Sequence, residues 1–285
     1  MATHARDLTR ALAVAGAALA LAAGAGLPRV AVPDAAAAPG GAVTVTSSTF
    51  ADDRDLFPAD PAAPVAPTTA VDPRLGSPTS YSLSKATGGV VLRWNPCAAI
   101  HYRVNTRYAP AGALADVKAA IARVRAATGI TFVYDGSTSV IPQANYGYAY
   151  NPLGSGTPPP LVIAWAKRGT GTGTSNLLTG GAEIARGGAT AMSWTTAAGV
   201  VHPLRAVTGL VVLDVAYNSK PGGFATTAGG TRGGVLLHEL GHVMGLQHVR
   251  DASQEMNPYL ISRASYGNGD NAGFAKVGKA AGCLN

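Results

Sequence analysis

The chain has 285 residues, of which 47% are hydrophobic and 13% are charged, and its formal net charge is +7. This composition excludes global disorder, and the presence of only two cysteines excludes both a disulfide-rich scaffold and a zinc site made of four thiolates. The length fits one domain of about 200 residues behind a processed N-terminal segment.

The N-terminal end has the order of features found in an export signal. Two arginines precede an apolar run at residues 11–26 that is rich in Ala and Gly. We assign residues 1–38 to a signal peptide, with small residues at 23–26 and at 35–38 as alternative cleavage sites. An uncleaved anchor is the alternative interpretation. No other stretch has the roughly 18 apolar residues that span a bilayer. We therefore expect a secreted, extracellular protein without a membrane span in its mature form.

Residues 39–85 are predicted to form a disordered pro-segment or linker, because Ala, Pro, Thr, Ser and Asp dominate without a helical or strand period. Residues 31–80 hold two Arg and six Asp, a balance of −4, whereas residues 81–285 hold seventeen Lys and Arg against eight Asp and Glu, a balance of +9. An acidic segment before a basic domain fits either a pro-segment that docks by charge or a solvated linker. The basic residues are scattered without a nucleic-acid-binding motif, so we expect no nucleic-acid partner.

The remaining residues, 86–285, show the periodic patterns of one α+β domain. Residues 112–128 place apolar side chains three to four positions apart, which predicts an amphipathic helix that ends at Gly129. A second helix is expected at 233–246. Strands are predicted at 100–105, 130–134, 161–165, 190–194 and 210–214. We therefore expect a twisted mixed β-sheet, two long helices and a small irregular C-terminal subdomain.

The second helix carries the residues that point to chemistry. His238 and His242 are four positions apart, so on a helix they face the same point. Neutral imidazole is a good zinc ligand. Glu239 follows the first histidine, where its carboxylate can act as a general base on a metal-activated water.

His248 is the candidate third ligand, provided that the helix ends before it. A continued helix would turn His248 to the wrong side, but Gly245 can take a positive φ and end the helix. Three histidines leave one coordination position open, which is typical of a catalytic zinc site, whereas a structural site is closed by four protein ligands. An exported binding protein with a structural zinc is the rival hypothesis.

The complete spacing, H-E-x-x-H-x-x-G-x-x-H, resembles that of the metzincin zinc endopeptidases. Met256 stands eight residues after His248 and is followed by Pro258, which is most similar to the matrixin-like branch. The segments WNPCAAIHYRVN, TGITFVYDG, LVVLDVAYN and GKAAGCLN resemble those of secreted bacterial matrixin-like peptidases. The resemblance implies a zincin-like catalytic domain and a monomeric, secreted endopeptidase that acts on proteins or peptides.

The same resemblance implies roles for individual residues. It makes Glu239 the general base, Met256 the apolar floor of a methionine turn, and Pro258 and Tyr259 the wall of a substrate pocket. The implied zinc ligands are His238, His242 and His248. Some matrixins also bind calcium, but the spacing of the acidic residues here is not that of a known calcium loop, and none is assigned.

The cysteines depart from the matrixin pattern, and the order of the strands suggests where a substrate would pair. Matrixins often carry a cysteine in the pro-segment, whereas this chain has only Cys97 and Cys283. An even pair in an exported protein favours a disulfide between them. The residues at 190–194 precede the buried strand at 210–214, and we expect them to form the sheet edge that pairs with an extended substrate.

Overall fold

The computed structural model describes residues 42–46 and 75–284, apart from residues 155 and 182. The predicted signal peptide, residues 1–38, lies outside the described residues, as do residues 47–74 of the predicted linker. Among the described residues, no helix is long and apolar enough to cross a membrane.

The domain is built on a mixed seven-stranded sheet with the strand order β1-β7-β8-β5-β3-β4, and β6 pairs with β5 beside this path. Strands β3, β4, β5 and β8 are parallel to one another, whereas β7 is antiparallel to β8 and β1 is antiparallel to β7. The bounds are β1 Ala42–Thr46, β3 Ile100–Asn105, β4 Phe132–Ser137, β5 Leu161–Arg168, β6 Thr174–Ser175, β7 Ala185–Thr195 and β8 Val201–Asp214. A second, two-stranded sheet joins β2 (Ser82–Leu83) to β9 (Leu246–Gln247).

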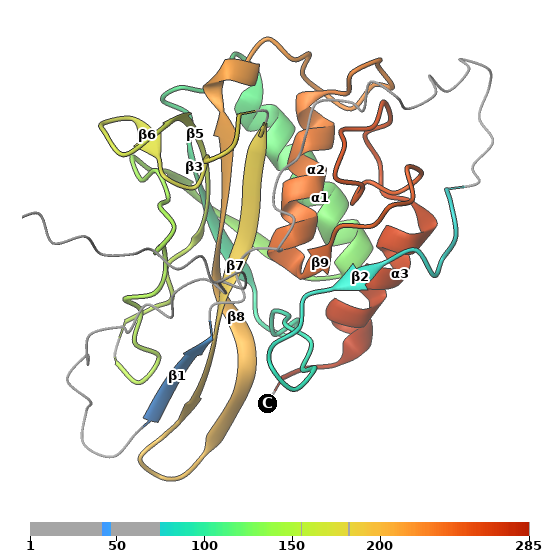
Figure 1. Ribbon diagram of the computed structural model, residues 1–285. Helices are drawn as coiled ribbons and strands as arrows, with labels where there is room; N and C mark the ends of the chain where they lie inside the picture. Colours follow the sequence, from blue (N-terminus) through green and yellow to red (C-terminus); the bar gives the residue numbers. More distant parts are fainter. Residues whose placement is uncertain (1–41, 47–74, 155, 182, 285) are drawn as a thin grey trace, which may run out of the picture. The chain divides into compact units, whose positions relative to one another are not determined.

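Three α-helices pack on one face of the sheet. They are α1 (Ala113–Thr128), α2 (Arg232–Met244) and α3 (Asn268–Val277), and short 3-10 turns follow at η1 (Val215–Tyr217) and η2 (Lys279–Ala281). Figure 1 shows α2 next to the strands and packed against α1, with α3 farther from the sheet. The helix α2 therefore lies between the sheet and the other helices, which explains why nearly all of its residues are buried.

The core follows from the alternation of side chains along the central strands. Trp165 of β5 and Val211 of β8 belong to the main core with the helices, and α1 adds Val117 and Val124 to it. The neighbouring residues of the strands point to the opposite face, because successive side chains of a strand alternate. They form a smaller cluster there with two leucines of the loop after β6. Both faces of the central strands are therefore buried. This agrees with the continuous apolar run at 210–214, because a strand that is buried on both faces does not alternate with polar residues.

The α+β class and the mixed sheet are confirmed, and so is much of the local structure. Strand β3 has the predicted bounds, and α1 ends at Gly129, which has a φ of 71°. The prediction of an irregular region after α2 is wrong at Asn268–Val277, because α3 forms there. The prediction of a linker without strands at 39–85 is wrong at Ala42–Thr46, which forms β1.

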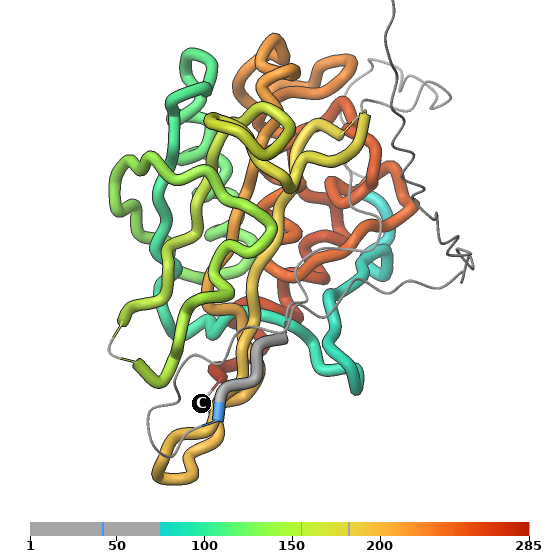
Figure 2. Tube along the Cα trace, turned by 60° about the vertical axis from the view of Figure 1, so that its left-hand side comes forward, coloured from blue at the N-terminus to red at the C-terminus, as the bar shows by residue number. Residues whose placement is uncertain are grey.

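The prediction of a free sheet edge at 190–194 is also largely wrong. These residues belong to β7, which forms a long antiparallel hairpin with β8. Figure 2 shows the end of this hairpin extending away from the helices. Strand β1 pairs with Ala191–Thr195 on the side of β7 that faces away from β8. The register of β1 covers only Ala191–Thr195 of β7 and does not extend to Ala185–Thr190.

Residues 75–85, which the sequence assigns to the linker, are bonded to the C-terminal part of the domain. The carbonyl oxygen of Leu75 accepts hydrogen bonds from the backbone N–H of Asn268 and from the side chain of Gln254. Leu83 pairs with Leu246 in the small sheet. The described chain is thus tied to the domain from Leu75 onwards.

Cys97 and Cys283 form a disulfide, with Cα atoms 5.5 Å apart and a sequence separation of 186. The same region is held by hydrogen bonds from Arg93 to the carbonyl oxygen of Gly282 and from Asn95 to that of Leu284. The disulfide therefore fastens the C-terminal end to the segment that leads into β3.

Loss of the disulfide is expected to destabilise the protein. The double variant C97S/C283S should lower the free energy of unfolding by up to about 5 kcal/mol, because the cross-link closes a long loop in the unfolded chain. Guanidinium denaturation of the variant and the parent, both under oxidising conditions, measures this difference. A loss below about 1 kcal/mol would show that the hydrogen bonds of Arg93 and Asn95 hold the C-terminal end without help from the disulfide.

Candidate metal centre

The helix α2 supplies three of the predicted site residues from one buried stretch. Thr231 caps its N-terminus, since its side chain accepts a hydrogen bond from the N–H of Gly234. His238 and Glu239 are 0% and 1% exposed, and His242 lies one turn after His238. The side chain of Glu239 is therefore held away from bulk water beside the first histidine.

The end of α2 brings His248 back to the other two histidines. Gly245 has a φ of 101°, and its N–H bonds to the carbonyl oxygens of Gly241 and His242. A Cβ atom at Gly245 would lie 2.4 Å from the carbonyl oxygen of Leu92, so only glycine fits there. The chain then turns through β9, and His248 follows directly.

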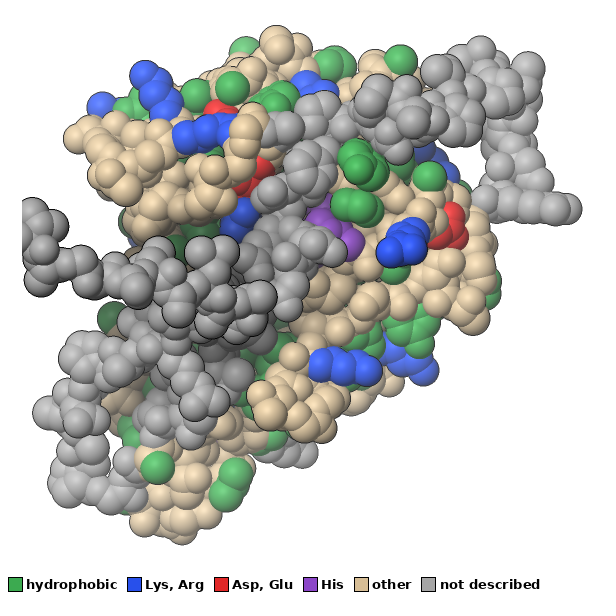
Figure 3. Space-filling view, viewed as in Figure 1, with side chains coloured by type: hydrophobic (Ala, Val, Ile, Leu, Met, Phe, Trp, Pro, Cys, Tyr) green, Lys and Arg blue, Asp and Glu red, His purple; other side chains and the backbone are tan. Residues whose placement is uncertain are grey.

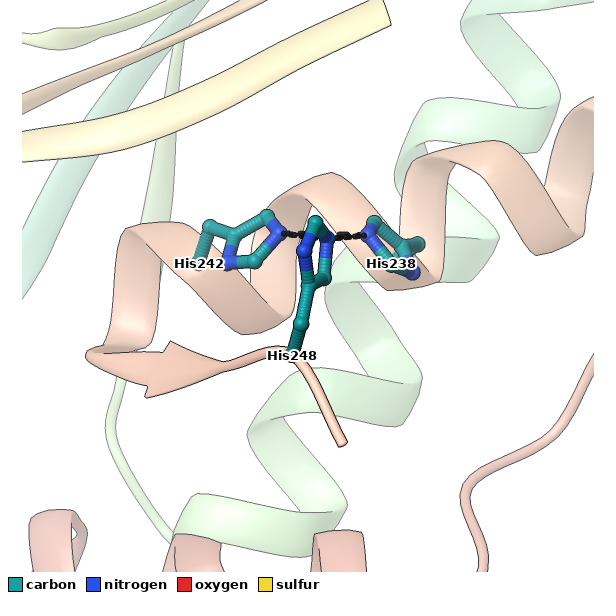
Figure 4. Close-up of side chains that lie close together, drawn as sticks. All are labelled: His238, His242 and His248. Carbon is teal, nitrogen blue, oxygen red and sulfur yellow. Dashed lines mark hydrogen bonds between the residues drawn. The ribbon is translucent and has the colours of Figure 1, made fainter. Parts of the chain in front are cut away.

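The three imidazoles converge on one point (Figure 4). The Nε2 atom of His238 lies 3.0 Å from that of His248 and 3.1 Å from that of His242. The Nε2 atoms of His242 and His248 are also 3.1 Å apart. One ion can bind all three nitrogens at the usual zinc–nitrogen distance of about 2.0–2.1 Å, because each pair lies closer together than twice that distance.

Hydrogen bonds to the backbone orient two of the rings and determine where their protons are. The Nδ1 atom of His238 donates to the carbonyl oxygen of Glu255 at 2.7 Å, and that of His242 donates to the carbonyl oxygen of Leu246 at 2.9 Å. A carbonyl oxygen only accepts, so both Nδ1 atoms carry the proton. The Nε2 lone pairs of His238 and His242 are therefore free to bind a metal ion.

Burial keeps these histidines in the neutral form that binds metals. Burial, together with the neighbouring His248, lowers the pKa of His242 to about 3. Burial and the two other histidines lower the pKa of His238 well below its usual value. Both rings are neutral near pH 7, and metal binding there requires no loss of a proton.

Met256 lies directly beneath the metal-binding helix. It is 1% exposed, and a Cβ atom at Gly241 would lie 2.3 Å from its Sδ atom. The glycine between His238 and His242 therefore makes room for the methionine. The N–H of Val249 donates to the carbonyl oxygen of Met256, so the methionine is also bonded to the residue after His248.

Asp270 of α3 supports the turn that contains Met256, a role that the sequence did not predict. Its carboxylate accepts hydrogen bonds from the backbone N–H groups of Glu255, at 2.7 Å, and Met256, at 3.3 Å. It also accepts one from Gly267 at the start of α3. Asp270 thereby fixes the backbone of Glu255, whose carbonyl oxygen orients His238. An Asp three residues after Gly267 is a helix-start signal that the sequence carried.

Strand β7 crosses α2 at the metal centre. A Cβ atom at Gly187 would lie 2.4 Å from the carbonyl oxygen of Glu239, so the strand and the helix touch through their backbones. A small cavity beside this crossing is lined by Ala189 and Ala191 of β7 and by His242. A histidine side chain reaches the molecular surface on this face, as Figure 3 shows in purple.

Pro258 and Tyr259 are the remaining residues for which the sequence predicts a role in the site. Tyr259 is exposed, Pro258 is half-buried, and neither lines the cavity beside His242. Their role in a substrate pocket stays a prediction. Among the acidic residues outside the triad, Asp214 is paired with Arg168, and Asp270 supports the methionine turn as described.

Within the described residues, the cluster that can hold a metal ion consists of His238, His242 and His248. Three converging imidazole nitrogens, two of them on rings that backbone hydrogen bonds orient, make an arrangement that can bind one divalent ion. Neither the family models nor the curated proteins with which we compared the chain match it.

Proposed function

We propose that the protein is a secreted zinc-dependent endopeptidase with a metzincin-like, matrixin-type catalytic domain. The observation that carries the proposal is the convergence of three Nε2 atoms within 3.1 Å of one another, with Glu239 next to the first ligand on the same buried helix. The disulfide between Cys97 and Cys283 suits an oxidising extracellular compartment.

Zinc is the ion that this donor set fits best, because three neutral imidazoles with an additional open position are typical of catalytic zinc sites. His238, His242 and His248 would hold it. When bound, zinc supplies Lewis acidity that polarises a peptide carbonyl and activates water.

The chain's own residues carry the proton transfers and the positioning. Glu239 takes a proton from the attacking water and passes it to the leaving amine, as a general base and then a general acid. The carbonyl oxygens of Glu255 and Leu246 keep two ligands in the correct tautomer and orientation. Met256 fills the space below the helix and keeps water out.

An extended substrate would pair with the edge of β7. Ala185–Thr190 lies beyond the register of β1, and Gly187 within it packs closely against the backbone of Glu239. A peptide added to this edge would pass the metal centre with its backbone hydrogen-bonded to β7.

Removal of the metal is expected to abolish proteolysis without unfolding the domain. Treatment with a chelator should reduce hydrolysis of an unstructured protein substrate to background, and one equivalent of zinc per chain should restore it. Magnesium should not, because it prefers oxygen ligands. Substrate cleavage followed by electrophoresis, with circular dichroism as the folding control, makes the measurement. Hydrolysis that persists in the metal-free protein would refute the proposal, and so would a zinc-loaded protein that cleaves no peptide bond.

A further inference from the structure

Two buried carboxylates lie where the chain enters β7, outside the metal centre. Glu183 and Asp214 are 0% and 3% exposed. Glu183 precedes β7 by two residues, and Asp214 ends β8, the strand next to β7. An ionised carboxylate is costly to bury unless cations and N–H donors compensate it. The fold must therefore supply partners for both groups.

Two arginines supply the opposite charges. The Nε atom of Arg186 donates to Oε1 of Glu183 at 2.7 Å, and the Nε atom of Arg168 donates to Oδ2 of Asp214 at 2.5 Å. The Nη2 atom of Arg168 also donates to the carbonyl oxygen of Glu183 at 2.6 Å. We call Arg168, Glu183, Arg186 and Asp214 the four-residue network. Its two guanidinium groups balance its two carboxylates.

The four-residue network holds the turn that leads into β7. Oε2 of Glu183 accepts hydrogen bonds from the backbone N–H groups of Thr179, at 2.8 Å, and Gly180, at 3.1 Å. The backbone N–H of Asp214 donates to the carbonyl oxygen of Ile184 at 2.8 Å. The start of β7 is therefore fixed from the preceding turn, from β5 through Arg168 and from the end of β8.

The start of β7 is also the part of the strand that lies at the metal centre. A Cβ atom at Gly187 would lie 2.4 Å from the carbonyl oxygen of Glu239, so the strand packs closely against the backbone of the proposed general base. A peptide that pairs with β7 takes its position from this strand. A shift of residues 185–189 relative to α2 would therefore move the substrate relative to Glu239.

We propose that the four-residue network positions the start of β7 for substrate binding, with Arg168 and Arg186 in the place that a bound metal cation would otherwise take. This inference rests on the proposed endopeptidase function. Glu183 is the central positioning residue, because it bonds to the turn, to β5 and to β7. It acts through the strand and not on the reacting atoms.

The donor set of the network does not fit a calcium ion. Calcium binds six to eight oxygen ligands. All four carboxylate oxygens already accept hydrogen bonds from N–H groups, since Oδ1 of Asp214 accepts one from Ala216 at 2.9 Å and the other three accept those named above. Two positively charged guanidinium groups beside these oxygens would also repel a cation. The position of β7 should therefore not depend on calcium.

The test uses the zinc-loaded full chain with the substitution E183Q. Glutamine keeps the size of the side chain but has no charge with which to pair Arg186. The matched control is D116N, because Asp116 of α1 forms a comparable pair with Arg232 of α2, in which Oδ2 and Nη2 are 2.6 Å apart. The control removes an ion pair of similar burial that has no contact with β7. Hydrogen exchange of residues 185–189, peptide kinetics and zinc titration are measured for each variant.

Hydrogen exchange at residues 185–189 is expected to be about ten-fold or more faster in E183Q than in D116N. KM for peptide hydrolysis should rise about ten-fold or more in E183Q only, while kcat stays within about three-fold of the parent value. Zinc affinity should not change, because the three ligands belong to α2 and to the turn after it.

Three results would overturn the proposal. Equal exchange in E183Q and D116N would show that Glu183 does not fix β7. Equal increases of KM in both variants would show a general loss of stability. Faster exchange in E183Q without an increase of KM would show that the network has no role in substrate binding.

R168Q provides the same comparison if E183Q does not fold, because Arg168 is the most exposed member of the network, at 30%. Its removal leaves the bonds of the Glu183 carboxylate in place. Exchange at residues 185–189 should then rise about three-fold or more over D116N. Exchange equal to that of D116N would contradict the proposal.

The calcium arm uses the unsubstituted, zinc-loaded chain in calcium-free buffer. Addition of about 5 mM calcium should leave exchange at residues 185–189 and KM within about two-fold of their values without calcium. Exchange that calcium slows by about three-fold or more would show that a bound cation holds this region, and the proposal would fail.

Failure of the proposed function is recognised separately. If no variant cleaves any peptide when loaded with zinc, the endopeptidase assignment fails, and the role in substrate binding fails with it. Hydrogen exchange requires no activity, so E183Q, D116N and the calcium arm still decide what fixes the start of β7. Faster exchange in E183Q alone, without an effect of calcium, is the result that the contacts of Glu183 predict.

Discussion

Replacing Glu239 with glutamine is expected to lower kcat/KM for peptide hydrolysis by about 100- to 10,000-fold while zinc remains bound. Glutamine keeps the size of the side chain but cannot accept a proton from water. The three Nε2 atoms that would hold the metal are unaffected, because Glu239 is not among the converging ligands. Steady-state kinetics and the metal content of the same preparation make the measurement.

The matched control is E255Q, which changes another buried glutamate near the triad. Burial, together with the charge of Asp270, raises the pKa of Glu255 well above its usual value, which favours the neutral form of its carboxyl group. Glutamine should therefore change kcat/KM by less than about three-fold, since the carbonyl oxygen that orients His238 remains. Unchanged turnover in E239Q would remove Glu239 from the mechanism and leave the structural zinc hypothesis in its place.

Replacing Gly245 with alanine is expected to destabilise the domain by about 3–4 kcal/mol and to weaken zinc binding by about ten-fold or more. Alanine is strained at a φ of 101°, and its Cβ atom would lie 2.4 Å from the carbonyl oxygen of Leu92. Relief of this contact moves the turn between α2 and His248. Chemical denaturation and competitive zinc titration measure the two effects.

Gly136 supplies the control for the strain alone. Its φ is 92°, but a Cβ atom there would meet nothing within 4 Å. G136A should therefore cost only about 1–2 kcal/mol and leave the zinc affinity unchanged. If both variants lost stability equally and bound zinc equally well, the turn at Gly245 would have no special role in placing His248.

The parts of the structure that were predictable from the sequence are those determined by neighbouring residues. The helix α1 has regular apolar spacing and a glycine at its end, and both features are local. The two histidines of α2 face one point because of their spacing alone, and the glycine that lets His248 return is close to them in the chain.

The parts that were missed depend on partners distant in the sequence or on packing. The helix α3 contains Gly269 and Gly273, which disfavour helix, and it is held by the burial of Phe274 and Val277. Strand β1 lies in a stretch whose composition indicates disorder, and its partner in β7 is far along the chain. Pairing over such a distance leaves no local pattern.

The hydrogen bonds that support the metal centre could not be predicted from the sequence either. His238 and His242 are oriented by backbone carbonyl oxygens, and every residue has one, so no side-chain type marks the acceptor. The spacing of Asp270 after Gly267 indicates the start of a helix, but it does not indicate that the carboxylate holds the backbone of the methionine turn. Hydrogen bonds that orient the metal-binding rings and their supporting backbone become visible only when the fold is known.

Zinc K-edge X-ray absorption of the zinc-loaded full chain tests the central claim most directly. We predict three imidazole nitrogens at about 2.0–2.1 Å and one or two oxygen ligands from solvent around a single zinc ion. The imidazole contribution should fall to two rings in H248A. A zinc ion enclosed by four protein ligands, or one bound by fewer than three imidazoles in the parent protein, would contradict the assignment of an open catalytic centre.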